Sequence, residues 1–538
     1  MKELMVKVVI VILVIFSLSF SQALAGDYLS CEAPVETASG LVKGKADEDT
    51  GTCSWKGIPY AAPPVGELRF RAPEPAEQWE GVREAYEFGD RCMQKGLMES
   101  VNADKGDMSE DCLYLNIWGP RKSGVFPVMV WIHGGGYTGG TGGSEFYQGD
   151  RLSETGDLVV VTINYRLNAF GFLALPALAK EDEHESAGSY GSLDQVAALR
   201  WVHENIAKFG GDPGNVTIFG ESAGGWSVCT MVATPLAKGF FQRAILESGG
   251  CLASTSMEKG FEQGRDAVRE VGCDPDDLAC LRSKDATEIL DKMVGGMLEG
   301  FNYVPRHDGY LLLDSPLAMI QSGEFNNVSF MAGSNRDEVT ALLSLSPLIA
   351  PRKKNRARKI FGKDADKVME LYPVSEYKKP KHAYGEASTD ASLACPTYDS
   401  MAAVAAYQPQ AYYYRFEFDD MRFGKYIGAL HAMEIPFVFN SLDRSPMNLL
   451  YPKKKLADAQ KLVPIIQGYW INFAKTGDPN GPDLPKWKPF RPDDQRVQIL
   501  DVNVRNEPVS ERYQERCEFW TEYLEDNPPM WETVGQTK

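Results

Sequence analysis

The sequence at residues 216–225 reads VTIFGESAGG, and this stretch decides the fold of the chain. Its first four residues are apolar or β-branched and predict a buried strand, while residues 226–233 can form a helix. The pattern Gly-x-Ser-x-Gly occurs once in the chain and is centred on Ser222. Between a strand and a helix it is typical of a nucleophile elbow, a strained turn that exposes the serine hydroxyl. Gly220 and Gly224 suit this turn because side chains there would collide across it.

A serine hydroxyl is a poor nucleophile near neutral pH, so this interpretation requires a base, an orienting acid and oxyanion donors elsewhere in the chain. A glycine turn, HGGG at residues 133–136, directly follows the apolar run 128–132. Successive glycines let the backbone approach a ligand closely, and with the N–H of Ala223 they can form an oxyanion hole. A plain flexible turn is the alternative, but the neighbouring elbow favours the oxyanion hole.

Apolar runs and helix-like stretches alternate along most of the chain. Residues 192–208 have the apolar spacing of a helix, and residues 340–395 are expected to form helices over the site. The alternation predicts an α/β fold with a mostly parallel sheet that is covered on both faces and functions at the carboxyl ends of its strands. No linker or repeat divides it, so we expect one large domain, residues 26–538. The predicted strands are residues 113–118, 128–132, 158–163, 216–219, 244–246, 328–332 and 412–418.

The base is expected to be a histidine, and the chain has six. His133 belongs to the glycine turn, and the other four histidines before His431 lie in polar stretches, inside the helix-like run or before a turn. His431 follows the last predicted strand. In folds with this elbow the chain order is nucleophile, acid, histidine, so His431 is the predicted base.

The acid should therefore lie between Ser222 and His431, on a loop after a strand. Asp337 and Glu338 belong to the segment GSNRDE, which directly follows the predicted strand 328–332. Spacing cannot separate these two neighbours. A surface acidic pair is the alternative interpretation.

The first 25 residues have the features of a cleaved signal peptide. Lys2 and Lys7 flank the start, the run 8–20 is apolar, and small residues ending at Ala25 provide a cleavage site. The run is shorter than the ~20 residues that span a bilayer. An uncleaved anchor is the alternative interpretation. No second segment of spanning length follows, so we expect an exported protein without a stable membrane anchor.

Composition limits the partners and cofactors of the chain. The net charge of −18 comes from 56 Lys and Arg against 74 Asp and Glu, which argues against nucleic acid or an anionic membrane as a partner. With 43% hydrophobic residues in 538, the chain can bury a large core. The sequence contains no Cys-x-x-Cys pair and no His-Glu-x-x-His motif. We therefore expect no metal and no organic cofactor.

Ten cysteines in an exported chain predict disulfides. Cys92 and Cys112 would close a loop of about 20 residues, which stabilises the fold by roughly 3 kcal/mol through the unfolded chain. Cys273 and Cys280 are close enough for a short bridged loop. Spacing alone cannot pair the other six, which are Cys31, Cys53, Cys229, Cys251, Cys395 and Cys517.

Two long motifs make the chain resemble the type-B carboxylesterase and cholinesterase-like lipase family of α/β-hydrolases. They read FGGDPGNVTIFGESAG at 209–224 and EDCLYLNIW at 110–118. Shorter matches are NYR at 164–166 and GIPYAAPP at 57–64, and the similarity runs from about residue 35 to 520. The resemblance implies an α/β-hydrolase fold with helical cap insertions, and it implies hydrolysis of carboxylic esters.

The resemblance also implies roles for single residues. It assigns the acid to Glu338, the second of the two neighbours. It implies Ser248 as a hydrogen-bonding support behind the triad and Glu221 as a neighbour of the histidine. The chain departs from the family pattern at Val339 and Ala432, where the family usually has glycine. The implied oxyanion donors are Gly135, Gly136 and Ala223. The implied bridges are Cys92–Cys112, Cys273–Cys280 and Cys395–Cys517, with Cys31–Cys53 as an additional pair.

The predicted reaction is hydrolysis of a small-molecule carboxylic ester through an acyl-enzyme, with a triad of Ser222, Glu338 and His431. Triacylglycerol lipase is the main alternative. A cholinesterase is disfavoured, because that subgroup has tryptophan ten residues before the cysteine matching Cys112, where this chain has Asn102. A non-catalytic adhesion protein of this fold is disfavoured because such relatives typically lose the serine. The acyl and alcohol groups and the oligomeric state do not follow from the sequence.

Overall fold

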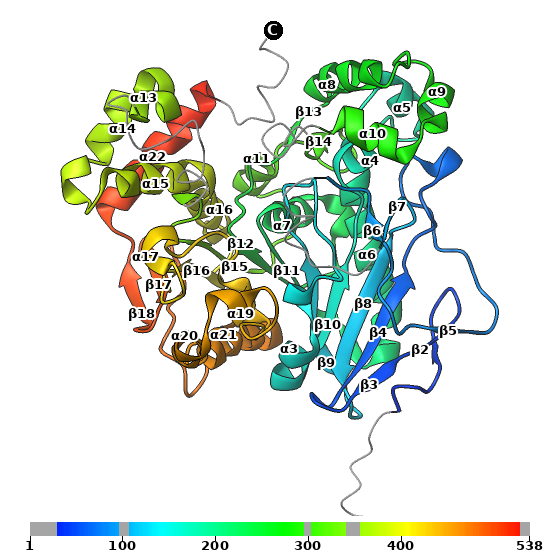
Figure 1. Cartoon of the computed structure of the whole chain (residues 1–538), viewed down its shortest axis with the longest axis horizontal. Coiled ribbons are helices and arrows are strands. Elements are labelled where there is room, and N and C mark those ends of the chain that lie inside the picture. Colours follow the sequence, from blue (N-terminus) through cyan, green and yellow to red (C-terminus); the bar gives the residue numbers. More distant parts are fainter. Residues whose placement is uncertain (1–29, 96–106, 295–302, 341–355, 528–538) are drawn as a thin grey trace, which may run out of the picture.

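The computed structural model describes residues 30–95, 107–294, 303–340 and 356–527, and its centre is a twisted sheet of eleven strands (Figure 1). In spatial order the strands are β18 (Arg505–Pro508), β17 (Arg496–Leu500), β16 (Ala411–Phe416), β15 (Ser329–Asn335), β12 (Arg243–Glu247), β11 (Gly211–Glu221), β9 (Phe126–Ile132), β10 (Val159–Ile163), β8 (Tyr114–Pro120), β4 (Thr52–Pro59) and β3 (Lys45–Asp47).

The strands from β17 to β10 in this order are parallel to their neighbours, and antiparallel strands complete both edges. On one edge β18 pairs with β17, and on the other β8, β4 and β3 follow β10. All seven predicted strands are present, with ends shifted by a few residues. The prediction of a mostly parallel sheet is confirmed. Crossovers between parallel strands require long connections, which the helices supply.

Strand β9 shows how the sheet separates two hydrophobic cores. Val128, Val130 and Ile132 belong to one core, and Met129 and Trp131 belong to the other. All five are completely buried. Successive side chains of a strand point to opposite faces, so a strand buried on both faces is apolar at every position. This explains why β9 reads as a continuous apolar run.

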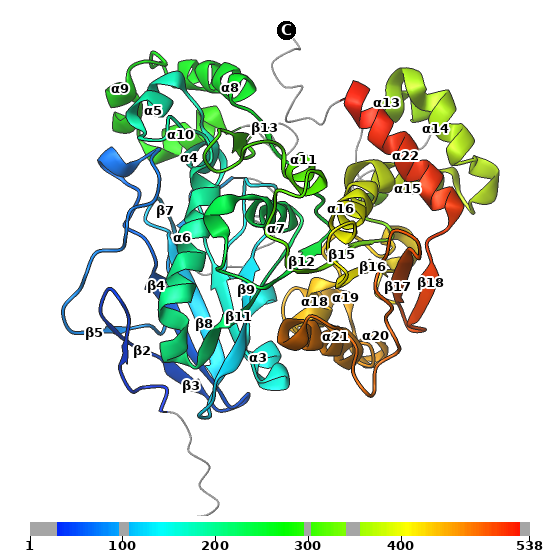
Figure 2. The same ribbon diagram turned by 180° about the vertical axis from the view of Figure 1, so that it is seen from behind.

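Helices cover both faces of the sheet, as the predicted fold class requires (Figures 1 and 2). On one face α7 (Ala223–Ala233) contacts β11 and β12, and α16 (Cys395–Ala405) contacts β15 and β16. On the other face α21 (Val463–Thr476) contacts β9 and β11. The predicted helix at 192–208 corresponds to α6 (Tyr190–Asn205) and the 3₁₀ turn η3 (Ile206–Phe209).

The described part of the predicted helical region 340–395 is mostly helical. It contains α13 (Arg356–Phe361), α14 (Ala365–Leu371), α15 (Pro380–Thr389) and the π-helical turn η8 (Asp390–Ala394), which leads into α16. Figures 1 and 2 both draw α13 and α14 beside the last helix, α22 (Glu511–Asp526). Residues 341–355 lie outside the described part of the chain.

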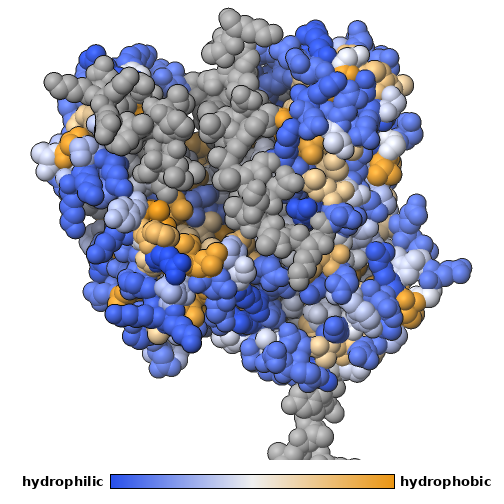
Figure 3. All heavy atoms as spheres, viewed as in Figure 1, coloured by the Kyte–Doolittle hydropathy of each residue, from blue (hydrophilic) through white to orange (hydrophobic). Residues whose placement is uncertain are grey.

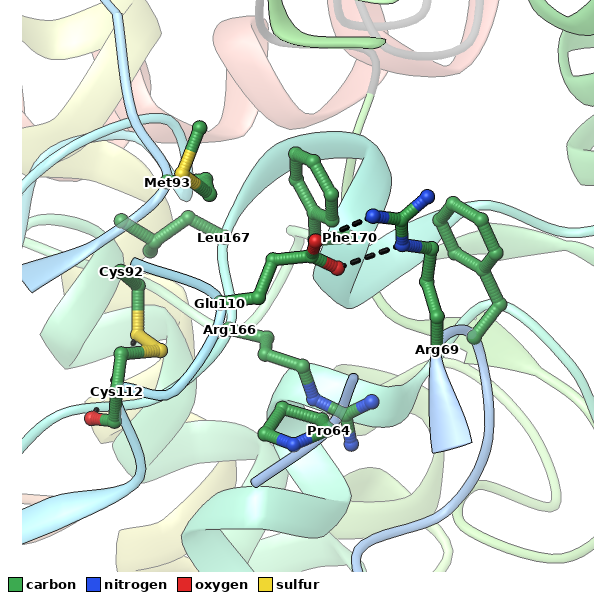
Figure 4. Close-up of a pocket in the computed structure, with 10 residues that line it drawn as sticks. Pro64, Arg69, Cys92, Met93, Glu110, Cys112, Arg166, Leu167 and Phe170 are labelled. Carbon is green, nitrogen blue, oxygen red and sulfur yellow. Dashed lines mark hydrogen bonds and ion pairs between the residues drawn. A yellow bond between two sulfur atoms is a disulfide. The ribbon is translucent and has the colours of Figure 1, made fainter. Parts of the chain in front are cut away.

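Five disulfides crosslink the fold. Four join the pairs named from the sequence, Cys31–Cys53, Cys92–Cys112, Cys273–Cys280 and Cys395–Cys517. The fifth joins Cys229 to Cys251, the pair that the sequence left unassigned, and ties α7 to the loop after β12. Figure 4 shows Cys92–Cys112 near an ion pair between Arg69 and Glu110.

The surface seen in Figure 3 is mostly hydrophilic, with apolar residues in small groups. No helix in the described ranges is long and apolar enough to cross a membrane. The predicted signal peptide, residues 1–25, lies outside those ranges.

Candidate active site

Ser222 occupies the sharp turn between β11 and α7. Its backbone has φ 59° and ψ −121°, a conformation that non-glycine residues rarely adopt and that persists where the surrounding structure holds it. The Ser222 N–H donates to the carbonyl of Glu247 at 2.9 Å, and its carbonyl accepts from the N–H of Trp226 at 2.9 Å. The strand on one side and the helix on the other therefore fix the turn. This is the geometry that the motif at 216–225 predicted.

The glycines of the elbow allow it to lie directly against the glycine turn. A Cβ atom on Gly220 would lie 2.5 Å from the carbonyl oxygen of Ile132, and one on Gly224 would come closer still. From the other side, a Cβ atom on Gly134 would lie 2.5 Å from the carbonyl oxygen of Glu221. Side chains at these positions would push the two turns apart. The close approach of the two turns therefore depends on glycine.

The glycine turn carries backbone donors that have no acceptor in the described chain. Gly135 and Gly136 have φ of 112° and 63°, values that favour glycine. Neither of their N–H groups, nor that of Ala223, donates a hydrogen bond to any other described residue. Unpaired N–H groups beside a serine hydroxyl can bind a developing oxyanion.

His133, the first residue of the glycine turn, has a structural environment. It is buried and stacks on Tyr165, with ring centroids 4.4 Å apart. The Tyr165 hydroxyl donates to the His133 carbonyl at 2.8 Å. Burial lowers the pKa of His133 to about 4. The ring is therefore neutral at ordinary pH and is not the basic histidine of this site.

His431 and Glu338 form a short hydrogen bond. Nδ1 of His431 lies 2.6 Å from Oε2 of Glu338, and the Glu338 carboxylate is completely buried. Its other oxygen accepts from the N–H of Asn335 at 2.6 Å. Asp337, the neighbouring acid, points away from the histidine and pairs with Arg336 at 2.8 Å. Of the two acids that spacing left open, Glu338 is the one that contacts the imidazole.

The other imidazole nitrogen faces a second carboxylate. Nε2 of His431 lies 3.2 Å from Oε1 of Glu221. Burial lowers the pKa of His431, but the charges of Glu221 and Glu338 outweigh that effect and raise it. Burial raises the pKa of Glu221, against the opposing charge of His431. No hydrogen bond joins Ser222 to His431 in the described structure. The turn contacts the imidazole through Glu221, the residue before Ser222.

The family model described as the carboxylesterase family matches residues 32–520. The chain belongs to the carboxylesterase family. The para-nitrobenzyl esterase of Bacillus subtilis (strain 168) is 37% identical to it over 495 residues, which cover 89% of this chain and 97% of that protein. The liver carboxylesterase of Sus scrofa is 35% identical over 571 aligned positions, covering 95% and 96%.

Solved structures show the same similarity. A carboxylesterase of Geobacillus stearothermophilus superposes with a TM-score of 0.79 at 34% identity, covering 90% of this chain and 99% of that one. A PNB esterase superposes with a TM-score of 0.77 at the same identity and coverage. The fold of this carboxylesterase is thus the α/β-hydrolase fold, and the protein is a carboxylic ester hydrolase.

Behind the histidine of this carboxylesterase lies a carboxylate that sequence analysis missed. Glu434 is completely buried, and Nδ2 of Asn335 donates to it in a short hydrogen bond. The Ser248 hydroxyl, expected as a support behind the triad, contacts Glu434 at 3.5 Å and none of the side chains of Ser222, Glu338 and His431. Its support is therefore indirect and weak. The spacing of Glu434, three residues after His431, carries no signal by itself.

No group of three or more His, Cys, Asp or Glu side chains in the described residues of this carboxylesterase could hold a metal ion.

Proposed function

We propose that this carboxylesterase hydrolyses esters through an acyl-enzyme formed on Ser222. The observation that carries the proposal is the strained turn at Ser222, whose preceding residue Glu221 contacts a histidine held on its other nitrogen by a buried glutamate. A nucleophile on an elbow, a base and an orienting acid in that chain order are typical of α/β-hydrolases. Family membership supports the reaction class.

In the proposed acylation step, Oγ of Ser222 attacks the ester carbonyl carbon while Nε2 of His431 takes the hydroxyl proton. The carbonyl oxygen gains the negative charge and is bound by three backbone N–H groups. When the tetrahedral intermediate collapses, His431 gives its proton to the leaving alcohol and Ser222 keeps the acyl group. Water then attacks the acyl carbonyl while His431 takes its proton. Collapse of the second intermediate releases the carboxylic acid, and His431 returns the proton to Ser222. The three N–H donors are those of Gly135, Gly136 and Ala223.

Glu338 fixes the imidazole so that Nδ1 carries a proton and Nε2 is free to accept one. It also stabilises the imidazolium that forms in each half-reaction. Ser222 is not hydrogen-bonded to His431 here, and such contacts are often long before substrate binds. Glu221 lies on the Nε2 side and would add to the stabilisation of the imidazolium. The two carboxylates therefore favour the transient positive charge.

Labelling tests the assignment of the nucleophile. A fluorophosphonate probe should attach to the wild-type enzyme at Ser222, and peptide mapping should identify that residue. The Ser222→Ala variant should not be labelled. Ser227, in the following helix, offers a matched control, because its hydroxyl is buried and donates to Ala223. Ser227→Ala should still be labelled at Ser222.

Triacylglycerol lipase remains the second candidate function, since a lipase of this fold would use the same site. Para-nitrophenyl esters of rising chain length, assayed beside emulsified triacylglycerol, distinguish the two. A preference for short, soluble esters supports an esterase, and a preference for the emulsion supports a lipase. Choline esters test the cholinesterase alternative; Asn102, which disfavours it, lies outside the described residues.

We also propose that the chain is exported, with cleavage after Ala25, and that residues 26–538 form one domain. Five disulfides are compatible with an oxidising compartment. The N-terminal sequence of protein from the medium or periplasm tests the cleavage. It should begin at Gly26, and an intact Met1 in exported protein would contradict the proposal.

A further inference from the structure

The two loops that carry Glu338 and His431 lie side by side after the parallel strands β15 and β16. Backbone hydrogen bonds join them at two points. The N–H of Asp337 donates to the carbonyl of Ala429 at 3.0 Å, and the N–H of His431 donates to the carbonyl of Glu338 at 3.3 Å. The distance between the two triad side chains therefore depends on how firmly the loops are joined.

One side chain completes this junction from the first loop. Oδ2 of Asp337 accepts the N–H of Ala429 at 3.0 Å, so the two residues exchange two hydrogen bonds. The same oxygen accepts from Nε of Arg336 at 2.8 Å. Arg336 in turn donates to Asp419, in the segment after β16, at 2.7 Å. Asp337 is thus held by Ala429 of the second loop and, through Arg336, by Asp419 after β16.

The second loop leaves space for this carboxylate at Gly428. Its φ of 69° favours glycine. A Cβ atom there would overlap Oδ2 of Asp337 at a separation far below any real contact. Glycine at 428 therefore permits the hydrogen bond between Asp337 and Ala429.

We propose that Asp337 is a positioning residue, which sets the separation of Glu338 and His431 by tying Ala429 to the acid-bearing loop. The inference rests on the proposed triad. It assigns to the neighbour of the acid a role that family resemblance did not imply. Asp337 contacts neither the imidazole nor the serine, so it acts only through the loop.

The partial exposure of Asp337 allows its positioning role to be distinguished from a role in stabilising the fold. A quarter of its side chain is exposed, and it lines a basin of about 760 Å³ together with Arg336 and Gly428. Water from the basin can replace a lost carboxylate at the Ala429 N–H, so removal of the side chain should cost little stability. Unlike the carboxylate, a water is exchangeable and is not anchored to the acid-bearing loop, so it joins the loops less firmly and the separation of the triad residues should change. Misplacement by 1 Å can cost about 100-fold in rate.

Kinetics of four variants test the proposal, with kcat expressed per site titrated by fluorophosphonate. Asp337→Ala should lower kcat by about 10- to 100-fold with KM and Tm little changed. Asp337→Asn keeps an oxygen that can accept the N–H of Ala429, so this variant should retain most of the wild-type kcat. Gly428→Ala should also lower kcat. In the double variant the Asp337 carboxylate is gone, so the Cβ atom at residue 428 no longer overlaps it. Gly428→Ala should therefore lower kcat far less in the Asp337→Ala background than in the wild type.

Gly272→Ala is the matched control for backbone strain, because Gly272 also has positive φ, 73°, but has open space where a Cβ would be. It should leave kcat unchanged. Wild-type kcat in Asp337→Ala, or losses in the double variant that simply multiply, would overturn the proposal. An incorrect triad assignment would be recognised separately, because the Glu338→Gln variant would then keep full activity.

Discussion

Nδ1 of His431 lies 2.6 Å from Oε2 of Glu338, although 93 residues separate them in the chain. The contact follows from topology. β15 and β16 are parallel neighbours, so the loops after them emerge at the same edge of the sheet. A third residue, Glu221, approaches the same ring from the elbow, 3.2 Å from Nε2. The imidazole is therefore held between two carboxylates, and each contact has a measurable consequence.

Glu338→Gln should reduce kcat by about 10⁴-fold with the fold intact, because glutamine keeps the shape but favours the wrong imidazole tautomer. Asp337→Asn is the matched control, since it makes the same chemical change one residue away and keeps the acceptor for Ala429. Its effect should be far smaller. Steady-state kinetics on a para-nitrophenyl ester give the ranking. A larger loss in Asp337→Asn than in Glu338→Gln would refute the assignment of the acid.

Ser222→Ala should reduce kcat by on the order of 10⁶-fold, as removal of a triad nucleophile does. The strained φ of 59° suits alanine no better than serine, so thermal unfolding should be nearly unchanged. Purified variant and wild type are compared by activity and by Tm. Activity above one per cent of wild type in the variant would be incompatible with Ser222 as the nucleophile.

Sequence periodicity and motif order were enough to predict the sheet and the sharp turn at Ser222, and they also selected His431, whose role as the base stays a prediction. Apolar runs such as β9 are visible because both faces of a parallel sheet are buried. The choice of Glu338 over Asp337 came from family resemblance, because adjacent side chains point in different directions and spacing cannot say which one faces the site. That direction is set by Asn335 and Ala429, which are distant from each other in the chain.

Other features could not be predicted because they depend on contacts between distant segments. Cys229 and Cys251 pair because α7 and the loop after β12 are adjacent, which no spacing rule encodes. Glu434 is an ordinary acid in sequence and becomes notable only when burial and Asn335 are known. Ser248 as a support of the triad stays a prediction, and its one long side-chain contact, to Glu434, could not be read from the sequence.

The pH dependence of activity should reflect the carboxylates around His431. Catalysis requires the neutral imidazole, so kcat/KM should fall as pH drops through its raised pKa, above the ordinary value near 6.5. Glu221→Gln removes a charge that stabilises the imidazolium, which lowers that pKa. The acid limb of the profile should therefore move to lower pH. The protonation of His431 and that of Glu221 are coupled, so the pKa read from the acid limb of the wild-type profile describes the pair and not His431 alone.

Glu183→Gln controls for net charge in this experiment, since the Glu183 side chain is 85% exposed and distant in sequence from the site. Its profile should match the wild type. An acid limb that stays in place, or moves to higher pH, in Glu221→Gln would show that Glu221 does not stabilise the charged histidine.

Loss of single disulfides should lower the free energy of unfolding in an order set by loop length. The bridged residues are 7 apart for Cys273–Cys280, 20 for Cys92–Cys112 and 122 for Cys395–Cys517. Loop-closure entropy predicts losses of roughly 2, 3 and 5 kcal/mol for the paired Cys→Ala variants. Denaturant unfolding measures them. Before that, mass spectrometry of unreduced tryptic peptides should find all three bridges, and free thiols at any of them would refute the prediction for that bridge.

Cys92–Cys112 should also differ from the other two bridges in its effect on catalysis. Two residues after Cys92, the Gln94 side chain donates to the carbonyl of Gly140 and accepts its N–H, both at 3.0 Å. Gly140 follows Gly139, whose carbonyl packs against Gly135 of the glycine turn. Without the bridge this support loosens, so kcat should fall at temperatures where the variant remains folded. The Cys273–Cys280 variant should keep its kcat, and equal losses in both would mean that Gln94 does not steady the oxyanion donors.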